Sequence, residues 1–355
     1  MSGHPRARRL GGIVGGAAGL VATGVAARVV AQRRAETRRR AERSQLRAEL
    51  GSLRGRVSRL SSEDGVELHV EVDEPAGEPS GATVVFVHGY ALNHDSWHYQ
   101  RQALRDRHRL VFYDQRSHGR SARSDDEHSN LDQLGRDLGR VVDAAAPSGP
   151  VVLVGHSMGG MSIMALAEQR PDLFGGRVVG VALLATSAGD LGKVTLGLPG
   201  VPGRLVHQLA PAALATLARI PAIAESGRKA HSELGYMLTQ RYAFGGHVPH
   251  ELAEFTDDML ASTPIGVVAA FFPVFAEHDR YAALAALRHV DVLVVSGDVD
   301  QLTPLTHGRE IAHRLPSAEF LELTGAGHML MLERPDEVNR ALAGLVDRAA
   351  AKAVA

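Results

Sequence analysis

The sequence predicts an α/β fold in which a mostly parallel central sheet is covered by helices on both faces. Short apolar runs alternate with segments of helical periodicity along most of the chain. Runs that are apolar on both faces are typical of parallel strands covered by helices on either side. The alternation is interrupted between about Leu191 and Leu287, where proline-punctuated helical segments predict a cap inserted over the carboxyl ends of the strands.

The predicted elements follow from these patterns in chain order. A hairpin opens the sheet, because Glu63-Asp64-Gly65 separates the alternating runs 56–60 and 66–72. Apolar runs predict further strands at 83–87, 110–113, 151–154, 178–184, 290–295 and 319–323. Amphipathic spacing predicts helices at 97–105, 131–145, 158–169, 304–315 and 335–350. The expected domain layout is an N-terminal apolar segment (1–31), a basic helical linker (32–55), a core in two parts (56–190 and 288–355) and the helical cap (191–287).

Composition excludes several classes of function. A net charge of −1 gives no field that would recruit nucleic acid, so we expect no nucleic-acid partner. The absence of cysteine excludes disulfides, thiolate zinc sites and a cysteine nucleophile, and it leaves the redox compartment open. The sequence carries no signal for an oligomeric state.

The apolar segment from Leu10 to Ala31 predicts a membrane anchor. As a helix it would extend about 33 Å, enough to span a bilayer. Seven arginines against two glutamates lie between Arg33 and Arg47, which favours a cytoplasmic position for the domain that follows. A cleaved secretory signal and a soluble glycine-rich tail are the alternatives, with a secreted or a soluble cytoplasmic protein as their consequence.

The pentapeptide Gly155-His156-Ser157-Met158-Gly159 follows the apolar run 151–154 and precedes a predicted helix. This context predicts a nucleophile elbow, a strand-to-helix turn so tight that glycines flank an exposed serine hydroxyl. The alternative is a tight glycine turn with a bystander serine. With these features the chain resembles the α/β-hydrolase family over roughly residues 56 to 350, and cap-bearing esterases and lipases with a GHSMGG elbow are the most similar members. Five motifs carry the resemblance: His88-Gly89, the segment 113–121 (YDQRSHGRS), the elbow, the segment 296–304 with its Gly-Asp-x-Asp and Thr-Pro, and Gly325-Ala326-Gly327-His328.

The resemblance implies a Ser-His-Asp triad of Ser157, His328 and Asp300. A serine hydroxyl needs a base to take its proton, and histidine is suited to that task near neutrality. The chain order serine, aspartate, histidine is the one expected for this fold. The second aspartate of Gly-Asp-x-Asp is the family's acid, so Asp298 is expected to bind loop amides instead. Asp114 is assigned to a structural turn held by Arg116, Gly119 and Ser121.

The resemblance also implies an oxyanion hole made by the backbone N–H groups of Tyr90 and Met158. Many capped relatives carry proline shortly after His-Gly, whereas this chain has Ala91-Leu92. His94 and His98 have the spacing of two metal ligands on a helix but lack a third, so we expect neither metal nor cofactor.

These features predict hydrolysis of a small-molecule ester or lipid through an acyl-enzyme. Carbon–carbon bond hydrolases and cofactor-free haloperoxidase-like perhydrolases use the same triad and stay as alternatives, and a membrane-tethered, non-catalytic binding scaffold is a more distant one. Some of the large apolar residues of the cap should line an acyl pocket. They are Met237, Tyr242, Phe244, Phe255, Met259, Phe271, Phe272 and Phe275.

Overall fold

The computed structural model describes residues 43–77, 81–195 and 233–354, together with a few positions between 203 and 216. The chain divides into two compact units, Met1–Glu49 and Leu50–Ala355. In the first unit residues 43–49 are helical, whereas the predicted anchor Leu10–Ala31 lies outside the described residues. The fold and the candidate site described below belong to the second unit.

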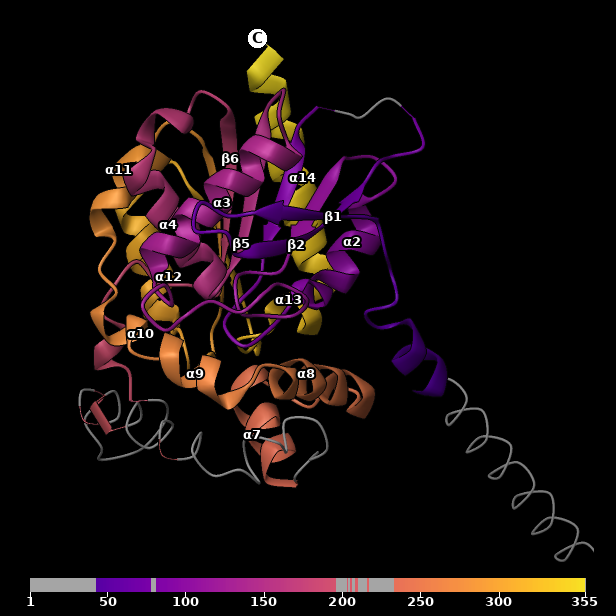
Figure 1. The fold of residues 1–355 in the computed structure, drawn as a ribbon, viewed down its shortest axis with the longest axis vertical. Coiled ribbons are helices and arrows are strands. Elements are labelled where there is room, and N and C mark those ends of the chain that lie inside the picture. Colours follow the sequence, from indigo (N-terminus) through magenta and orange to yellow (C-terminus); the bar gives the residue numbers. More distant parts are fainter. Residues whose placement is uncertain are drawn as a thin grey trace, which may run out of the picture. The chain divides into compact units, whose positions relative to one another are not determined.

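A sheet of eight strands forms the centre of the second unit (Figure 1). The strands follow the order β1-β2-β4-β3-β5-β6-β7-β8 across the sheet. The predicted hairpin is present as the antiparallel pair β1 and β2, and β2 is also antiparallel to β4. All other neighbours are parallel, so the predicted mostly parallel sheet is confirmed. The strand bounds are β1 Arg56–Ser61, β2 Glu67–Asp73, β3 Thr83–Val87, β4 Leu110–Tyr113, β5 Val151–His156, β6 Val178–Leu184, β7 Asp291–Gly297 and β8 Glu319–Leu323.

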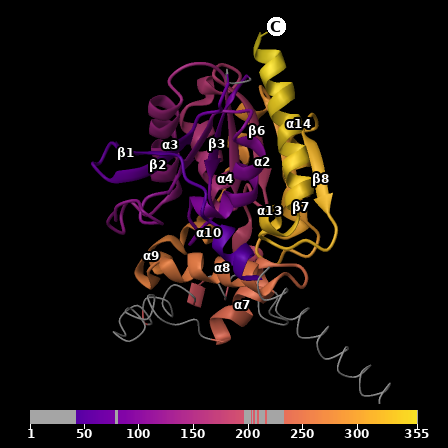
Figure 2. The same ribbon diagram turned by 90° about the vertical axis from the view of Figure 1, so that its right-hand side faces the viewer.

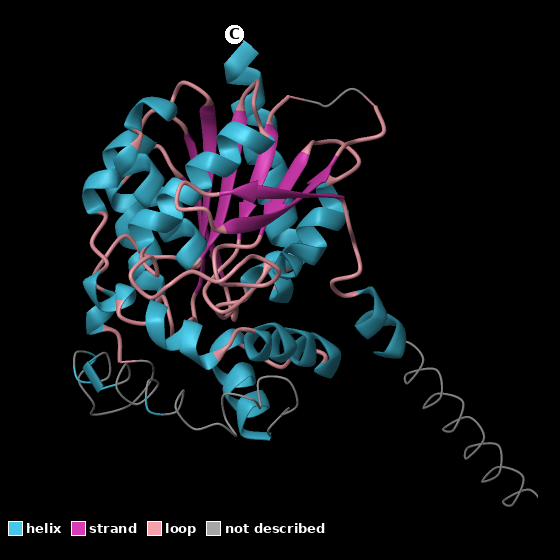
Figure 3. Cartoon of the chain, in the orientation of Figure 1, coloured by secondary structure: helices cyan, strands magenta, loops and turns pink. Residues whose placement is uncertain are grey.

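Helices cover both faces of the sheet, as the apolar runs require (Figures 2 and 3). Alternate residues of each strand face opposite sides. Val85, Val87 and Leu153 belong to a core cluster that also contains buried residues of α3 and α4, among them Leu138 and Ile163. Phe86 instead faces the other side, where its ring lies 5.2 Å from that of Trp97. The helices of the core are η1 His94–Trp97, α2 His98–Leu104, α3 Leu131–Ala145, α4 Met158–Gln169, η2 Pro171–Leu173, α12 Leu305–Arg314, α13 Leu330–Glu333 and α14 Pro335–Val354.

The described part of the connection between β6 and β7, within the range 191–287 assigned to the cap, is mostly helical. Figure 1 shows α7, α8 and α9 together at one end of the sheet, and they share a pocket with the loops that follow β3, β5, β7 and β8. They therefore cover the carboxyl ends of the strands. The last segment, α11, instead packs Leu284 and Leu287 into the core beside α4. The bounds are η3 Leu191–Lys193, α7 Glu233–Ala243, α8 His250–Ser262, α9 Ile265–Phe271, α10 Val274–Glu277, η4 Tyr281–Ala283 and α11 Leu284–Leu287.

Within the described part of the chain, no single helix has the length and apolar character needed to cross a membrane. One bent pair, His250–Ser262 with Ile265–Glu277, passes that test of length and composition only when taken together, with an angle of 80° at the break.

Candidate active site

Ser157 lies at a sharp turn between β5 and α4. Its backbone has φ 51° and ψ −118°, a positive φ that is uncommon for a residue with a side chain. The Ser157 N–H donates to the Leu184 carbonyl at 2.9 Å, and its own carbonyl accepts from Thr186 Oγ1 at 2.7 Å. These bonds to the neighbouring strand β6 and to the loop after it hold the backbone in its strained conformation.

The glycines on either side of Ser157 are required by close backbone approaches. A Cβ at Gly155 would lie 2.6 Å from the Gly160 nitrogen, and one at Gly159 would lie 2.1 Å from the Val87 carbonyl oxygen. Gly160 has the same constraint, because its Cβ would lie 2.7 Å from Thr186 Oγ1. The local sequence thus allows α4 to begin directly against the ends of β3 and β6.

His328 and Asp300 form a buried pair on the loops after β8 and β7. His328 Nδ1 donates to Asp300 Oδ2 at 2.8 Å. Thr303 Oγ1 donates to the same oxygen at 2.7 Å, while the N–H groups of Leu302 and Thr303 donate to Oδ1 at 2.8 and 3.0 Å. Burial raises the pKa of Asp300, but the neighbouring His328 and these hydrogen bonds outweigh it and leave the pKa below its usual value. Asp300 therefore stays ionised beside the imidazole.

Asp298 has a different environment from Asp300. Its Oδ1 accepts from the Gly325 N–H at 2.6 Å, which ties the loop after β7 to the glycine-rich loop that carries His328. This contact agrees with the predicted role of Asp298 as a loop carboxylate.

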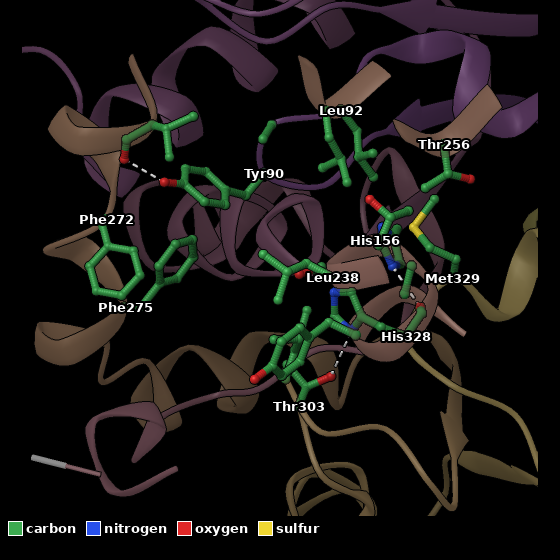
Figure 4. A pocket seen from close by; sticks show the side chains of 18 of the residues that line it. Tyr90, Leu92, His156, Leu238, Thr256, Phe272, Phe275, Thr303, His328 and Met329 are labelled. Carbon is green, nitrogen blue, oxygen red and sulfur yellow. Dashed lines mark hydrogen bonds between the residues drawn. The ribbon is translucent and has the colours of Figure 1, made fainter. Parts of the chain in front are cut away.

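Ser157 and His328 line the same pocket, which has a volume of about 560 Å³ (Figure 4). Between these two described residues no hydrogen bond is formed, so the structure brings the serine and the imidazole to one cavity without joining them. Catalytic hydrogen bonds of this kind are often loose until substrate is present. Of the eight apolar cap residues expected to line an acyl pocket, Tyr242, Phe272 and Phe275 do so.

The remaining five residues of that set lie elsewhere. Met237 is 65% exposed, and the other four are buried without lining the pocket. They are Phe244, Phe255, Met259 and Phe271.

Of the two expected oxyanion donors, Tyr90 lines the pocket, and Met158 directly follows the pocket-lining Ser157 in the chain. The Met158 N–H is the first amide of α4, and such amides lack an intrahelical partner. Tyr90 lines the pocket, and its hydroxyl donates to the Val268 carbonyl of α9. The next residue, Ala91, has φ 57°, a left-handed conformation that the departure from proline at this point permits.

His88 holds the loop that carries Tyr90. Because a carbonyl only accepts and an amide N–H only donates, His88 Nδ1–H donates to Gly89 O at 2.7 Å and Nε2 accepts from Gln115 N–H at 2.9 Å. Burial, and next the charge of His118, lower the pKa of His88 to about 3. The ring is therefore neutral, and its two nitrogens join the loop after β3 to the loop after β4.

The predicted structural turn around Asp114 is present. Asp114 Oδ2 accepts from the Arg120 N–H at 2.8 Å, and Ser121 Oγ donates to the Asp114 carbonyl at 2.6 Å. Gly119 has φ 52°, and a Cβ there would lie 2.4 Å from the Asp114 carboxylate. Arg116 points elsewhere, into a buried ion pair with Asp137 on α3.

Sequence analysis missed His156, which lies beside Ser157. Its Nε2–H donates to the His328 carbonyl at 3.0 Å, and the two rings have their centroids 4.8 Å apart. Burial and then the charge of His328 lower the pKa of His156 to about 3. The position within the elbow was visible in the sequence, but a contact between residues 172 positions apart was not.

Glu333 of α13 is a second residue that sequence analysis missed. Its carboxylate accepts from the N–H groups of Gly327, Gly245 and Gly246 at 2.7 to 3.2 Å. Glu333 thus connects the loop of His328 to the segment after α7. Neither glycine in that segment carried a sequence signal for this contact.

Candidate metal ligands gather away from this pocket. In the described part of the chain, His69, His94 and Asp114 have ligand atoms within 4.8 Å of one another. The protein already bonds this group, because His94 Nδ1–H donates to Asp114 at 2.8 Å and His94 Nε2 lies 3.3 Å from Glu71 Oε1. Burial lowers the pKa of His94, but the charge of Asp114 and these carboxylate bonds outweigh it and raise the pKa to about 9, so the ring is a cation held by carboxylates. The arrangement is an ion-pair network between β2, η1 and the turn after β4.

Comparison with known proteins identifies the family. The chain matches the model of the alpha/beta hydrolase family over residues 84–341, and it belongs to that family. The match covers the sheet from β3 to β8, the cap and the loops that carry Ser157, Asp300 and His328. The chain is thus a hydrolase enzyme by family.

Three characterised relatives differ in the reactions that their names describe. The chain is 26% identical over 266 residues to the dihydrolipoyllysine-residue acetyltransferase component of an acetoin cleaving system from Pseudomonas putida, a match that covers 74% of this chain and 63% of the relative. It is 24% identical over 287 residues to 3-oxoadipate enol-lactonase 1 from Acinetobacter baylyi, covering 81% and 96%. It is 27% identical over 279 residues to a non-heme chloroperoxidase from Kitasatospora aureofaciens, covering 78% and 94%.

Solved structures agree with the fold. A thermophilic esterase from Thermogutta terrifontis superposes with a TM-score of 0.64 at 23% identity, and the match covers 83% of this chain and 100% of the esterase. The enol-lactonase from Burkholderia xenovorans LB400 gives a TM-score of 0.65 at 23% identity, covering 81% and 99%. These likenesses establish the architecture.

Proposed function

We propose that the chain hydrolyses carboxylic esters through an acyl-enzyme formed on Ser157. The observation that carries this proposal is the buried His328–Asp300 pair on the wall of an apolar pocket that Ser157 also lines. Ser157 Oγ attacks the ester carbonyl while His328 Nε2 takes its proton, and Asp300 holds the imidazole by Nδ1 and stabilises its charged form. His328 returns the proton to the departing alcohol, and a water molecule then releases the acid by the same route.

The developing oxyanion would be stabilised by the N–H groups of Tyr90 and Met158. Support comes from the first amide of α4, which has no intrahelical partner, and from His88, which ties the loop before Tyr90 to Gln115 on the loop after β4. The elbow glycines Gly155 and Gly159 would serve this geometry by allowing the helix amides to approach the substrate closely.

The test is covalent labelling with a serine-reactive organophosphonate followed by assay on 4-nitrophenyl esters. Wild-type protein should lose activity in step with labelling, and the label should map to Ser157. Ser157→Ala should take up no label and retain its fold by circular dichroism. A non-catalytic binding scaffold would not react at Ser157, and it would show no ester turnover.

Two enzymatic alternatives use the same triad. The relative named chloroperoxidase supports a perhydrolase reaction, whereas the relative named enol-lactonase supports hydrolysis of a cyclic ester. Carbon–carbon bond hydrolysis is the other alternative. Peroxide-dependent bromination of a dye and cleavage of a β-diketone, each measured beside ester turnover, separate the three activities.

We also propose that residues 10–31 anchor the protein at a membrane, with the catalytic domain in the cytoplasm. For the domain layout we propose the one predicted from sequence, except that α11, at the end of the predicted cap, belongs to the core. The arginines between Arg33 and Arg47 support this orientation. Membrane fractionation with a carbonate wash compares the full chain with a shortened chain beginning at Gly51. Full-length protein in the soluble fraction, or protein shortened by its first 27 to 31 residues, would contradict the anchor.

A further inference from the structure

The described wall of the pocket beside Ser157 is almost entirely uncharged. Among the described residues that line it there is no aspartate, glutamate, lysine or arginine. Most of this described lining consists of apolar side chains from α4, from the loops after β3, β7 and β8, and from the cap. They include Leu92, Met161, Leu238, Phe272, Leu302 and Met329.

The cap threonines in this wall are committed to other partners. Thr239 Oγ1 of α7 donates to Asp257 Oδ1 at 2.9 Å, and Thr256 Oγ1 of α8 donates to the Leu252 carbonyl at 2.9 Å. Each hydroxyl has a single proton, so neither can donate a hydrogen bond to a bound molecule without losing one inside the protein.

The polar groups nearer to Ser157 are committed as well. The Tyr90 hydroxyl donates to the Val268 carbonyl, and Thr303 Oγ1 donates to Asp300 at 2.7 Å. His156 gives its Nε2–H to the His328 carbonyl at 3.0 Å. These side chains therefore do not provide a free donor for a carboxylate, a phosphate or a carbohydrate in the substrate.

We infer that the group entering this pocket is an uncharged hydrocarbon, so the enzyme selects neutral aliphatic or aryl esters and rejects esters whose acyl end carries a negative charge. This inference rests on the proposed ester hydrolysis. A carboxylate entering the pocket would lose its hydration, and the described lining offers it no lysine or arginine in return. A methylene in the same place improves binding about fourfold.

Three 4-nitrophenyl esters with the same leaving group test this selection. They are the hexanoate, the adipate monoester, in which a carboxylate replaces the terminal methyl group, and the methyl ester of that adipate, which is longer but neutral. We expect kcat/KM for the hexanoate to exceed that for the free adipate by at least about a hundredfold. The methyl adipate ester should lie within about tenfold of the hexanoate.

Other outcomes distinguish this inference from the proposed function. Equal turnover of hexanoate and free adipate would overturn the inference while leaving ester hydrolysis intact. Poor turnover of both adipate esters would overturn the inference too, since the length of the acyl chain and not its charge would then explain the poor turnover of the free adipate. No turnover of any ester, with no organophosphonate labelling of Ser157, would refute ester hydrolysis itself and the inference with it.

A pair of variants tests charge directly. Leu238 on α7 lines the pocket and is 47% exposed, so a long polar side chain there can reach solvent. Leu238→Arg should lower the ratio of kcat/KM for the hexanoate to kcat/KM for the free adipate by about tenfold, because the arginine supplies a cation for the carboxylate. Leu238→Gln should leave the ratio as in wild type. Equal narrowing by both variants would overturn the inference.

Discussion

Replacing Asp300 by asparagine should abolish most of the activity, because the proton of the neutral His328 ring would move from Nδ1 to Nε2. Asp300 accepts four hydrogen bonds, two on each carboxylate oxygen. An asparagine has one oxygen, and the backbone N–H groups of Leu302 and Thr303 require that oxygen on their side. The NH₂ group then faces His328 Nδ1, which must accept, and the ring proton moves to Nε2. An imidazole protonated there cannot take the proton of Ser157.

The expected loss is about 10⁴-fold in kcat, equivalent to roughly 5 kcal/mol of transition-state stabilisation. The assay is 4-nitrophenyl ester hydrolysis with kcat and KM determined separately, and thermal unfolding checks that the fold persists. Asp298→Asn is the matched control, because its amide oxygen can still accept from the Gly325 N–H. We expect that variant to lose less than about tenfold. A larger loss in Asp298→Asn than in Asp300→Asn would refute the assignment of the acid.

The remaining predictions concern the nucleophile, the elbow and acid stability. Ser157→Ala and His328→Ala should each lower ester turnover by several orders of magnitude, and the double variant should be little worse, because the two residues act as a unit; multiplicative losses would contradict this. Gly159→Ala should lower the free energy of unfolding, measured with urea, by about 3 kcal/mol, because its Cβ would lie 2.1 Å from a carbonyl oxygen of β3. Gly266→Ala is the control and should not lower it, because a Cβ at Gly266 has no atom within 4 Å. Folding lowers the pKa of His156 from 6.5 to about 3, so as pH falls below 6.5 the unfolded chain binds a proton that the folded chain does not, and the folded state loses stability. The free energy of unfolding of His156→Asn should therefore fall by about 2 kcal/mol less than that of the wild type between pH 7 and pH 5. An equal fall in both proteins would argue against a neutral buried ring.

Most of the sheet could be predicted from the sequence because both faces of its parallel strands are buried. The run predicted at 83–87 coincides with β3, and that at 178–184 coincides with β6. The predicted ends of two elements near the candidate site differ from those in the structure. The strand predicted at 151–154 continues to His156, because the elbow extends the ladder to the nucleophile. The helix predicted at 97–105 begins at His94 as a 3-10 turn, whose Asn93 cap accepts from Asp95 N–H.

The candidate site was predictable where residues near in sequence act together, and unpredictable where they do not. The choice between Asp298 and Asp300 followed the resemblance to the family's Gly-Asp-x-Asp motif, and the contacts of both carboxylates agree with it. The support of His328 by His156 and Glu333 depends on loops that meet only in the folded chain. The side chain of Tyr90 was likewise missed, because its bond to α9 joins the core to the cap.

The buried histidines around the pocket strengthen the assignment of His328 as the base. His88 uses both ring nitrogens to hold backbone, and His156 uses Nε2 to hold the loop of His328. Burial lowers the pKa of each to about 3, so both rings remain neutral and are poor proton acceptors near neutrality. His118 is equally buried, has a lowered pKa and bonds through Nδ1 to the Arg116 carbonyl. Of these four imidazoles, His328 is the one that combines a carboxylate partner on Nδ1 with a place on the pocket wall beside the serine, which is the arrangement that proton transfer from a hydroxyl requires.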